Sequence, residues 1–484
     1  MRNSCSNFST MGNVVLTLAA LSMPTQADDS LRAEVRSALT KSMRFFREDV
    51  ARHGGFQYAY SEDLKRSSGE SRRGAETVVT VQPPGTPAVG DRFLDAYEIT
   101  GDNVHLEGAR SAARCLLEGQ LRSGGWGYAV EYDPELRPTH AYRVEPEAHD
   151  QKNTTVLDDN TTQLTLRFLM RLDKLLGFED DTLHDAIHYG LDSLVKAQFA
   201  NGAWPQRYDT FPDPSEHQPR RASFTDDWPR KYPGPKYKKW YTFNDNTIAD
   251  VIKTLFKAGH TYGEAKYREA AKKGADFILL AQLPEPQPAW AQQYEYNMHP
   301  VWARKFEPAA VSGRESMDIM LTLLEIYRET GETKYLDPIP PALAYFRRSV
   351  LPDGSIARFY EMTTNQPLFF TKKYELTYSD ADLPTHYGFK NPDRTGMIEA
   401  RYRRLRTFGP RARLEEPQAK EALATAARDV LGKMDAKGRW VVPGKIRRDE
   451  PHEPNGVIQT GTFLHYTGRL CAYLRATSSW QRGD

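Results

Sequence analysis

The sequence predicts an all-α protein, an incomplete (α/α) toroid of about six helical hairpins joined by short extended loops that carry aromatic residues. Three observations indicate this fold. Apolar residues recur at helical spacing over most of the 484 residues. Six loops follow one plan, in which a helix ends at a small residue and a large apolar residue then opens an extended stretch. These loops lie 66 to 86 residues apart, which leaves room for about two helices and their turns.

Each of the six loops has one anchor, the large residue that opens its extended stretch. The anchors are Phe56, Trp126, Trp204, Trp290, Ile356 and Trp440. Because a single hairpin cannot bury its apolar face alone, successive hairpins are expected to pack into one ring with the loops on a shared face. The anchors either fill this ring or offer flat faces to sugar rings, and the residues alone leave both interpretations open.

Helices are expected where apolar residues recur at steps of three and four, as at Leu169, Leu172 and Leu176. Such segments cover residues 89–99, 104–120, 160–176, 182–199, 246–258, 266–283, 314–329, 332–350, 420–434 and 462–475. Turns such as Thr100-Gly101-Asp102 separate the members of a pair, because glycine readily ends a helix. Long connections remain at 138–159, 209–240, 287–313 and 361–402, and functional residues are expected there.

The amino-terminal residues 1–27 have the pattern of a secretory signal peptide. Arg2 precedes an apolar run at 14–23, and small residues at 25–27 offer a cleavage site. That run is too short to span a bilayer. We therefore expect a secreted or periplasmic protein, in which residues 28–484 form a single toroid domain and the membrane is not a partner once the signal is cleaved.

The charges of the chain are balanced, with 65 Lys and Arg against 64 Asp and Glu, a net charge of +1. This balance gives no electrostatic case for a nucleic-acid or membrane partner. Three cysteines are few for an exported protein, and Cys115 and Cys471 are expected to be buried thiols within helices. We expect a monomer.

Several motifs, in this order along the chain, resemble signatures of the family-10 polysaccharide lyases, the pectate lyases. They occupy residues 158–163, 201–208 (Asn-Gly-Ala-Trp-Pro-Gln-Arg-Tyr), 242–246 (Thr-Phe-Asn-Asp-Asn), 303–308, 312–316 and 358–361. The resemblance covers about residues 150–390, which we therefore expect to be the catalytic part. Several motifs in one order are far more specific than any single one.

The resemblance implies a pectate lyase that cleaves polygalacturonate, a pectic uronate polymer, by β-elimination. In that reaction a base removes the C5 proton of a uronate, and the glycosidic oxygen at C4 leaves. Calcium assists, because a hard cation on the C6 carboxylate makes the C5 proton more acidic. Such a site needs clustered aspartates close to cationic side chains.

Asp245, Asp158 and Asp159 are the candidate calcium ligands. Each lies directly before a predicted helix, beside asparagine. Acidic and amide residues at this position are also ordinary N-caps, so the residues alone leave capping and metal binding open. The resemblance favours metal binding by Asp245, with Asn246 as the helix cap, and leaves open which of Asp158 and Asp159 is the ligand.

The resemblance also implies that Arg304 is the catalytic base. A guanidinium is normally protonated, so this role requires burial and neighbouring cations to lower the pKa of Arg304. The alternative is that Arg304 pairs with Glu307 or clamps a substrate carboxylate.

Further residues are implied as substrate-binding groups. They are Arg358, Lys305, Lys372, Lys373, Trp204, Gln206 and Asn244. Arg358 is expected either to bind a substrate carboxylate or to form a salt bridge with a loop acid such as Glu361. The segment 371–390 departs from the family pattern, because lysines stand where arginines are usual and lysine lacks the bidentate fork.

Two other functions remain compatible with these residues. One is a toroidal glycoside hydrolase that uses two carboxylates, such as Glu307 and Asp245, as acid and base. The other is a non-catalytic protein that binds uronate saccharides.

Overall fold

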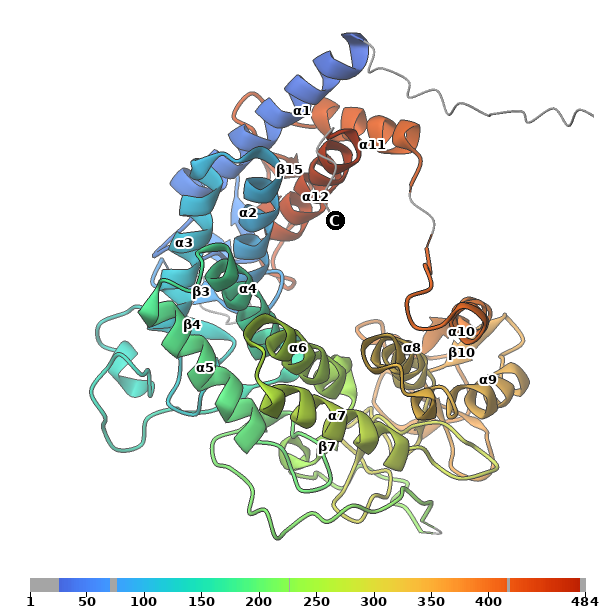
Figure 1. Ribbon diagram of the computed structural model, residues 1–484. Coiled ribbons are helices and arrows are strands. Elements are labelled where there is room, and N and C mark those ends of the chain that lie inside the picture. Colours follow the sequence, from blue (N-terminus) through green and yellow to red (C-terminus); the bar gives the residue numbers. More distant parts are fainter. Residues whose placement is uncertain (1–25, 70–75, 226, 416–417, 479–484) are drawn as a thin grey trace, which may run out of the picture.

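The computed structural model describes residues 26–69, 76–225, 227–415 and 418–478, so the predicted signal peptide lies almost entirely outside the described residues. Within these ranges twelve α-helices follow one another, with short strands between them (Figure 1). The helices are α1 (Gln26–Phe45), α2 (Thr86–Thr100), α3 (Asn103–Glu118), α4 (Thr161–Leu175), α5 (Asp181–Lys196), α6 (Thr247–Tyr262), α7 (Ala265–Leu280), α8 (Gly313–Thr330), α9 (Ile339–Arg348), α10 (Thr395–Phe408), α11 (Lys420–Gly432) and α12 (Thr460–Thr477).

The helices form two layers of a ring. The even-numbered helices lie inside, where α12, α2, α4, α6, α8 and α10 pack against one another in this order. In the outer layer α1 contacts α3, α3 contacts α5, and α5 contacts α7. Figure 1 shows the ring open between α10 and the α11–α12 pair. The fold is therefore an incomplete (α/α) toroid, as the sequence predicted.

Short antiparallel strands link the loops of neighbouring hairpins. The two-stranded pairs are β3 (Val78–Thr80) with β4 (Ala129–Glu131), β5 (Thr155–Val156) with β6 (Arg207–Tyr208), β7 (Tyr241–Thr242) with β8 (Gln293–Tyr294), and β10 (Ser355–Ala357) with β14 (Lys390–Pro392). In register, Val156 lies opposite Arg207 and Thr242 lies opposite Gln293. One residue, Leu157, separates β5 from Asp158, so the strand pairs fix where the loop side chains begin.

Two four-stranded antiparallel sheets complete the loop region. One has the order β15 (Val441–Val442), β16 (Val457–Gln459), β1 (Ala59–Ser61) and β2 (Ser67–Ser68), and so joins the two ends of the described chain. The other has the order β13 (Leu376–Thr377), β12 (Pro367–Phe370), β11 (Phe359–Tyr360) and β9 (Val311–Ser312).

The six loop anchors are core residues. All are buried, with at most 3% of their surface exposed. The indole Nε1 groups of Trp126, Trp204, Trp290 and Trp440 donate hydrogen bonds of 2.7 to 3.0 Å to the carbonyls of Leu116, Leu194, Ile278 and Val430. Each indole thus pairs with a carbonyl in the last turn of its own outer helix, α3, α5, α7 or α11, where carbonyls have no partner further along the helix ladder. Of the two interpretations, the filling of the ring is confirmed.

The structure differs from the sequence-based prediction in three elements. The expected helix at 332–350 begins only at Ile339, after a short 3-10 turn over Thr333–Tyr335, because prolines occupy its first turn. The expected loop 361–402 contains strands β12, β13 and β14 and the start of α10. Helix α1 was not predicted.

Two smaller expectations can be compared with the described residues. Cys115 and Cys471 are buried free thiols, as predicted. No helix in the described ranges combines the length and the apolar character that crossing a bilayer requires.

We expect Trp204→Ala to lower the free energy of unfolding by about 3–5 kcal/mol, because loss of a buried indole leaves a cavity. The midpoint of urea unfolding, followed by circular dichroism, measures this change. Phe408→Ala in α10 is the control, since Phe408 is 71% exposed, and its effect is expected to stay within about 0.5 kcal/mol. Equal midpoints for both variants would contradict the structural role of Trp204.

Candidate functional site

Two consecutive inner helices begin with the same unusual turn. Residues 158–160 precede α4 and residues 244–246 precede α6, each as a short 3-10 turn. In both turns the second and third residues have positive φ, 50° and 61° at Asp159 and Asn160, and 46° and 60° at Asp245 and Asn246. Aspartate and asparagine tolerate this left-handed region better than other non-glycine residues.

The helix caps in these turns differ from the prediction. Asn246 stands at the N-cap of α6, but its side chain makes no capping hydrogen bond, so the predicted cap is wrong. The first residue of the helix closes the turn: the hydroxyl of Thr247 donates to the carbonyl of Asn244 at 2.8 Å. Thr161 donates in the same way to the carbonyl of Asp158 at 2.9 Å.

The paired turns bring three predicted metal ligands together. One carboxylate oxygen from each of Asp158, Asp159 and Asp245 lies within 4.8 Å of the other two, and this is the one such group of acidic, histidine or cysteine side chains in the described ranges. We call these three residues the carboxylate triad. Both Asp158 and Asp159 belong to the triad, so their positions do not favour one of them over the other as the ligand.

Neighbouring polar groups hold the triad in place. The hydroxyl of Tyr128 donates to Oδ2 of Asp158 at 2.7 Å, and Nε2 of Gln82 donates to Oδ2 of Asp159 at 2.8 Å. Nδ2 of Asn244 donates to Oδ2 of Asp245 at 2.6 Å. Each of these three hydrogen bonds engages the Oδ2 atom of a triad carboxylate.

The triad favours the binding of a cation. Asp158 is only 9% exposed, and its Oδ1 is buried without a hydrogen-bond partner in the described structure. Burial raises the pKa of Asp158, the hydrogen bond from Tyr128 lowers it, and the charge of Asp245 raises it again. Oδ1 of Asn244 is likewise buried and unpartnered. Hard oxygen donors in this arrangement fit a divalent cation.

Arg304 is held by Glu307 in a two-point ion pair. Nε of Arg304 lies 2.8 Å from Oε2 of Glu307, and Nη2 lies 2.5 Å from Oε1. Burial lowers the pKa of Arg304, but the carboxylate of Glu307 outweighs this effect and raises the pKa above its ordinary value. The expected lowering is therefore wrong for this structure, and the Glu307 pairing that was its alternative is present.

Arg304 nevertheless shares the region of the triad. Its charge, together with that of Arg207, lowers the pKa of Asp158. The charges of Glu307, Arg304 and Asp158 all act on the pKa of Tyr237, which lies in the 209–240 connection. The cation and the acidic cluster that the sequence predicted to converge thus lie in one electrostatic neighbourhood, and the Arg304 side chain is 40% exposed there.

The divergent segment 371–390 covers this side of the site. The hydroxyl of Tyr387 donates to Oε1 of Glu307 at 2.7 Å, and its ring lies 5.4 Å from the guanidinium carbon of Arg304. Lys305 is exposed, with Nζ 3.6 Å from the centre of the Tyr374 ring. The segment therefore supplies aromatic contacts to the Arg304 region.

Arg358 is a buried structural residue. It is 2% exposed, and its Nη2 lies 2.7 Å from Oε1 of Glu315 at the start of α8. The ring of Tyr387 covers its guanidinium at 4.1 Å. Its predicted contact with substrate is therefore wrong in this structure. The salt-bridge alternative is present, with Glu315 as the partner in place of Glu361.

The remaining predicted binding residues divide into buried and exposed groups. Trp204 is completely buried, so its assignment to substrate binding is wrong. Gln206 and Asn244 are 5% and 4% exposed, and Asn244 acts on Asp245 as described above. Lys372 and Lys373 are exposed, and Nζ of Lys372 lies 3.1 Å from Asp382.

Sequence reasoning missed the groups that position the triad. Tyr128 and Arg207 lie in the second and third aromatic loops, and Nη2 of Arg207 donates to the hydroxyl of Tyr128 at 2.8 Å. Gln82 comes from a separate loop before α2. Tyr128 and Arg207 occur in loops that follow the repeated plan, so their places in those loops could have identified them.

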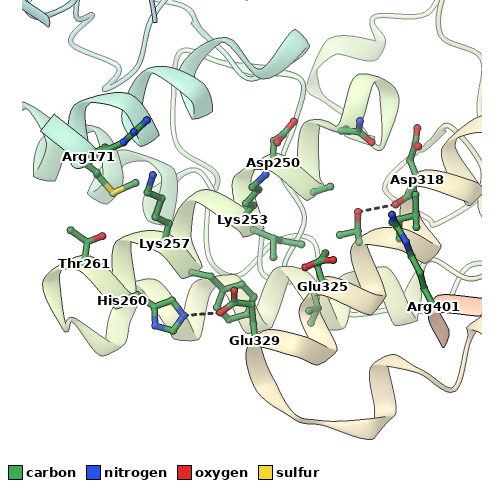
Figure 2. Close-up of a pocket in the computed structure, with 18 of the residues that line it drawn as sticks. Arg171, Asp250, Lys253, Lys257, His260, Thr261, Asp318, Glu325, Glu329 and Arg401 are labelled. Carbon is green, nitrogen blue, oxygen red and sulfur yellow. Dashed lines mark hydrogen bonds and ion pairs between the residues drawn. The ribbon is translucent and has the colours of Figure 1, made fainter. Parts of the chain in front are cut away.

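A cavity of about 750 Å³ lies in the ring interior, away from this chemistry. Residues of α4, α6 and α8 line it (Figure 2). Charged side chains in the cavity pair with one another. For example, Nε2 of His260 lies 2.7 Å from Oε2 of Glu329. Only Asn246, at one end, connects it to the triad turns. We therefore place the functional site at the triad.

Residues 120–355 match the family described as pectic acid lyase. That range contains the triad and Arg304. The matched range is a little under half of the chain. No curated protein sequence matches the chain.

Solved structures with similar folds include lyases and other sugar-acting enzymes. A family 10 polysaccharide lyase from Cellvibrio cellulosa, an aspartate-to-alanine mutant in complex with trigalacturonic acid, is 19% identical, with a TM-score of 0.45 over 66% of this chain and 98% of that chain. A cellobiose 2-epimerase from Bacillus thermoamylovorans is 11% identical, with a TM-score of 0.48 over 93% and 99%. An inactive alpha-1,6-mannanase from Salegentibacter is 13% identical, with a TM-score of 0.42 over 92% and 99%.

We expect Tyr128→Phe to make calcium binding at the triad more sensitive to acid. The hydrogen bond from Tyr128 lowers the pKa of Asp158, so its loss raises that pKa and lets protons compete with the cation at higher pH. Calcium titration by calorimetry over a pH series measures this shift. A pH dependence identical to that of the wild type would contradict it.

Proposed function

We propose that this lyase cleaves polygalacturonate by calcium-assisted β-elimination, and that residues 1–27 direct it to the periplasm or the medium. The observation that carries the proposal is the carboxylate triad beside Arg304. The family match supports the reaction class, and the similar Cellvibrio lyase holds trigalacturonic acid. The predicted signal pattern supports export.

Asp158, Asp159 and Asp245 would hold the calcium ion. Their oxygen donors, the raised pKa of Asp158 and the unpartnered buried oxygens of Asp158 and Asn244 all fit a hard cation. When bound, calcium neutralises a C6 carboxylate and so acidifies the neighbouring C5 proton.

Arg304 is the proposed base, and Glu307 positions it. Because the ion pair keeps the guanidinium charged, Arg304 must first release a proton to solvent, while the ionised Glu307 holds the side chain in position. The neutral guanidine then takes the C5 proton, the C4–oxygen bond breaks, and its electrons leave with the glycosidic oxygen while the C4–C5 double bond forms. Tyr387 orients Glu307 through its hydroxyl.

A glycoside hydrolase with Glu307 as the acid is disfavoured by the same contacts. Burial raises the pKa of Glu307, but the hydrogen bond and charge of Arg304, with the hydrogen bonds of Tyr387 and Gln292, together lower the pKa below its ordinary value. Glu307 is also only 2% exposed. It therefore stays ionised and cannot donate a proton to a leaving group as a hydrolase acid must.

We expect polygalacturonate to yield products that absorb as conjugated unsaturated uronates, and a chelator to abolish this signal. Readdition of calcium restores it in the wild type. In Asp245→Asn the calcium affinity falls, because a charged ligand is lost while the side-chain shape is kept, so more calcium is needed for the same rate. Chain shortening without the absorbance would indicate hydrolysis, and binding without shortening would indicate a non-catalytic protein.

We expect Arg304→Ala to reduce kcat by about 10²–10⁴-fold, the range for loss of a positioned proton-transfer group. The rate of absorbance increase at saturating substrate measures the change. Calcium affinity, measured on the same protein sample, is the control for an intact triad. A variant that keeps wild-type kcat with a raised KM would assign Arg304 to substrate binding instead.

A further inference from the structure

A small pocket adjoins the site on the side of the 209–240 connection. It has a volume of about 220 Å³, with Pro205 and Tyr208 in its lining beside Phe211, His217 and Tyr296. Pockets for drug-sized ligands are larger, about 300–1,000 Å³, so this one suits a single ring.

Two aromatic side chains of this pocket are exposed, unlike the buried loop anchors. Phe211 is 46% exposed and Tyr296 is 41% exposed. The Tyr296 ring lies 4.3 Å from the ring of His217, and the Phe211 ring lies 6.0 Å from that of Tyr208. The hydroxyl of Tyr296 donates to the carbonyl of Lys239 at 3.2 Å. Both aromatic faces are thus supported by neighbours, as a stacking surface for a sugar ring requires.

The charges of the pocket disfavour an anionic sugar. Its two basic side chains already have partners: Arg207 donates to the hydroxyl of Tyr128, and Nζ of Lys239 lies 3.6 Å from Oδ1 of Asp209, which also lines the pocket. Asp213 and Glu216 add negative charge to the lining. Carboxylates accept hydrogen bonds from sugar hydroxyls but repel a uronate carboxylate.

The pocket is linked to the carboxylate triad through the backbone. Arg207 and Tyr208 form β6, which pairs with β5, and β5 leads directly to Asp158. On the other side Pro205 bridges to Tyr241 of β7, which leads to Asp245. The same strand pairs thus carry both the pocket lining and the turns of the triad.

We propose that this pocket is a subsite for an uncharged pyranose of the substrate, either a methyl-esterified uronate or a neutral hexose. The role of this subsite in cleavage rests on the proposed lyase function. The binding of a sugar in the pocket is independent of that function. The consequence is a lyase adapted to pectic chains that are not uniformly charged.

Binding to the metal-free protein tests the subsite separately from catalysis. The full chain is titrated in chelator with trigalacturonate, with its trimethyl ester and with galactotriose. We expect one or both neutral probes to bind, and Phe211→Ala to weaken that binding about three- to tenfold, the effect of losing one aromatic contact. The affinity for trigalacturonate stays unchanged in this variant. The neutral probe that binds more tightly identifies the source of the ring.

Tyr232→Ala is the matched control, because Tyr232 is 44% exposed on the same connection and does not line the pocket. It is expected to leave all three affinities unchanged. The proposal is overturned if neither neutral probe binds the wild type, if Phe211→Ala leaves the neutral affinities unaltered, or if it weakens trigalacturonate equally. A loss of lyase activity in the separate cleavage assay leaves these binding results intact.

Discussion

The mutual repulsion of three carboxylates is the constraint around which the loop face is built. Aspartates within 4.8 Å of one another destabilise the folded state unless a cation or a proton offsets their charge. The fold holds them there through two left-handed turns that flexible loops would not maintain. Strands β5 and β7 fix the start of each turn, and α4 and α6 fix its end. The buried tryptophans and their hydrogen bonds to the outer helices supply the rigidity that this arrangement requires.

The ion pair of Arg304 and Glu307 has two opposite effects on the proposed reaction. It holds the guanidinium in one orientation, which favours a positioned proton transfer. It also raises the pKa of Arg304, which reduces the fraction of neutral base. Tyr387 reaches Glu307 from the segment where the chain departs most from the family pattern. The balance between orientation and basicity in this protein therefore depends on its divergent part.

Local patterns predicted the ring, the family resemblance predicted the triad, and distant contacts determined the errors. The helices follow from apolar spacing and glycine turns, whereas the place of Asp158, Asp159 and Asp245 before two helices left capping and metal binding open until the resemblance favoured metal binding. The partner of Arg358 could not be predicted, because Glu315 is distant in sequence and the nearby Glu361 was an equally reasonable candidate. In the structure Arg230 pairs with Glu361. Trp204 was assigned to substrate for its ring, and only packing shows that the ring is enclosed. The pKa of Arg304 depends on its ion pair with Glu307, which the sequence offered only as one of several alternatives.

The twin turns also tie the site to the curvature of the toroid. Asp158 and Asp159 belong to one repeat and Asp245 to the next, so no single hairpin contains all three oxygens. Their separation is set by the angle at which α4 and α6 meet along the inner wall. A shallower or tighter bend at this one junction would separate or crowd the ligands, even if every side chain kept its rotamer. The bend per repeat determines how many repeats complete the ring, and at the α4–α6 junction the same bend determines the ion affinity.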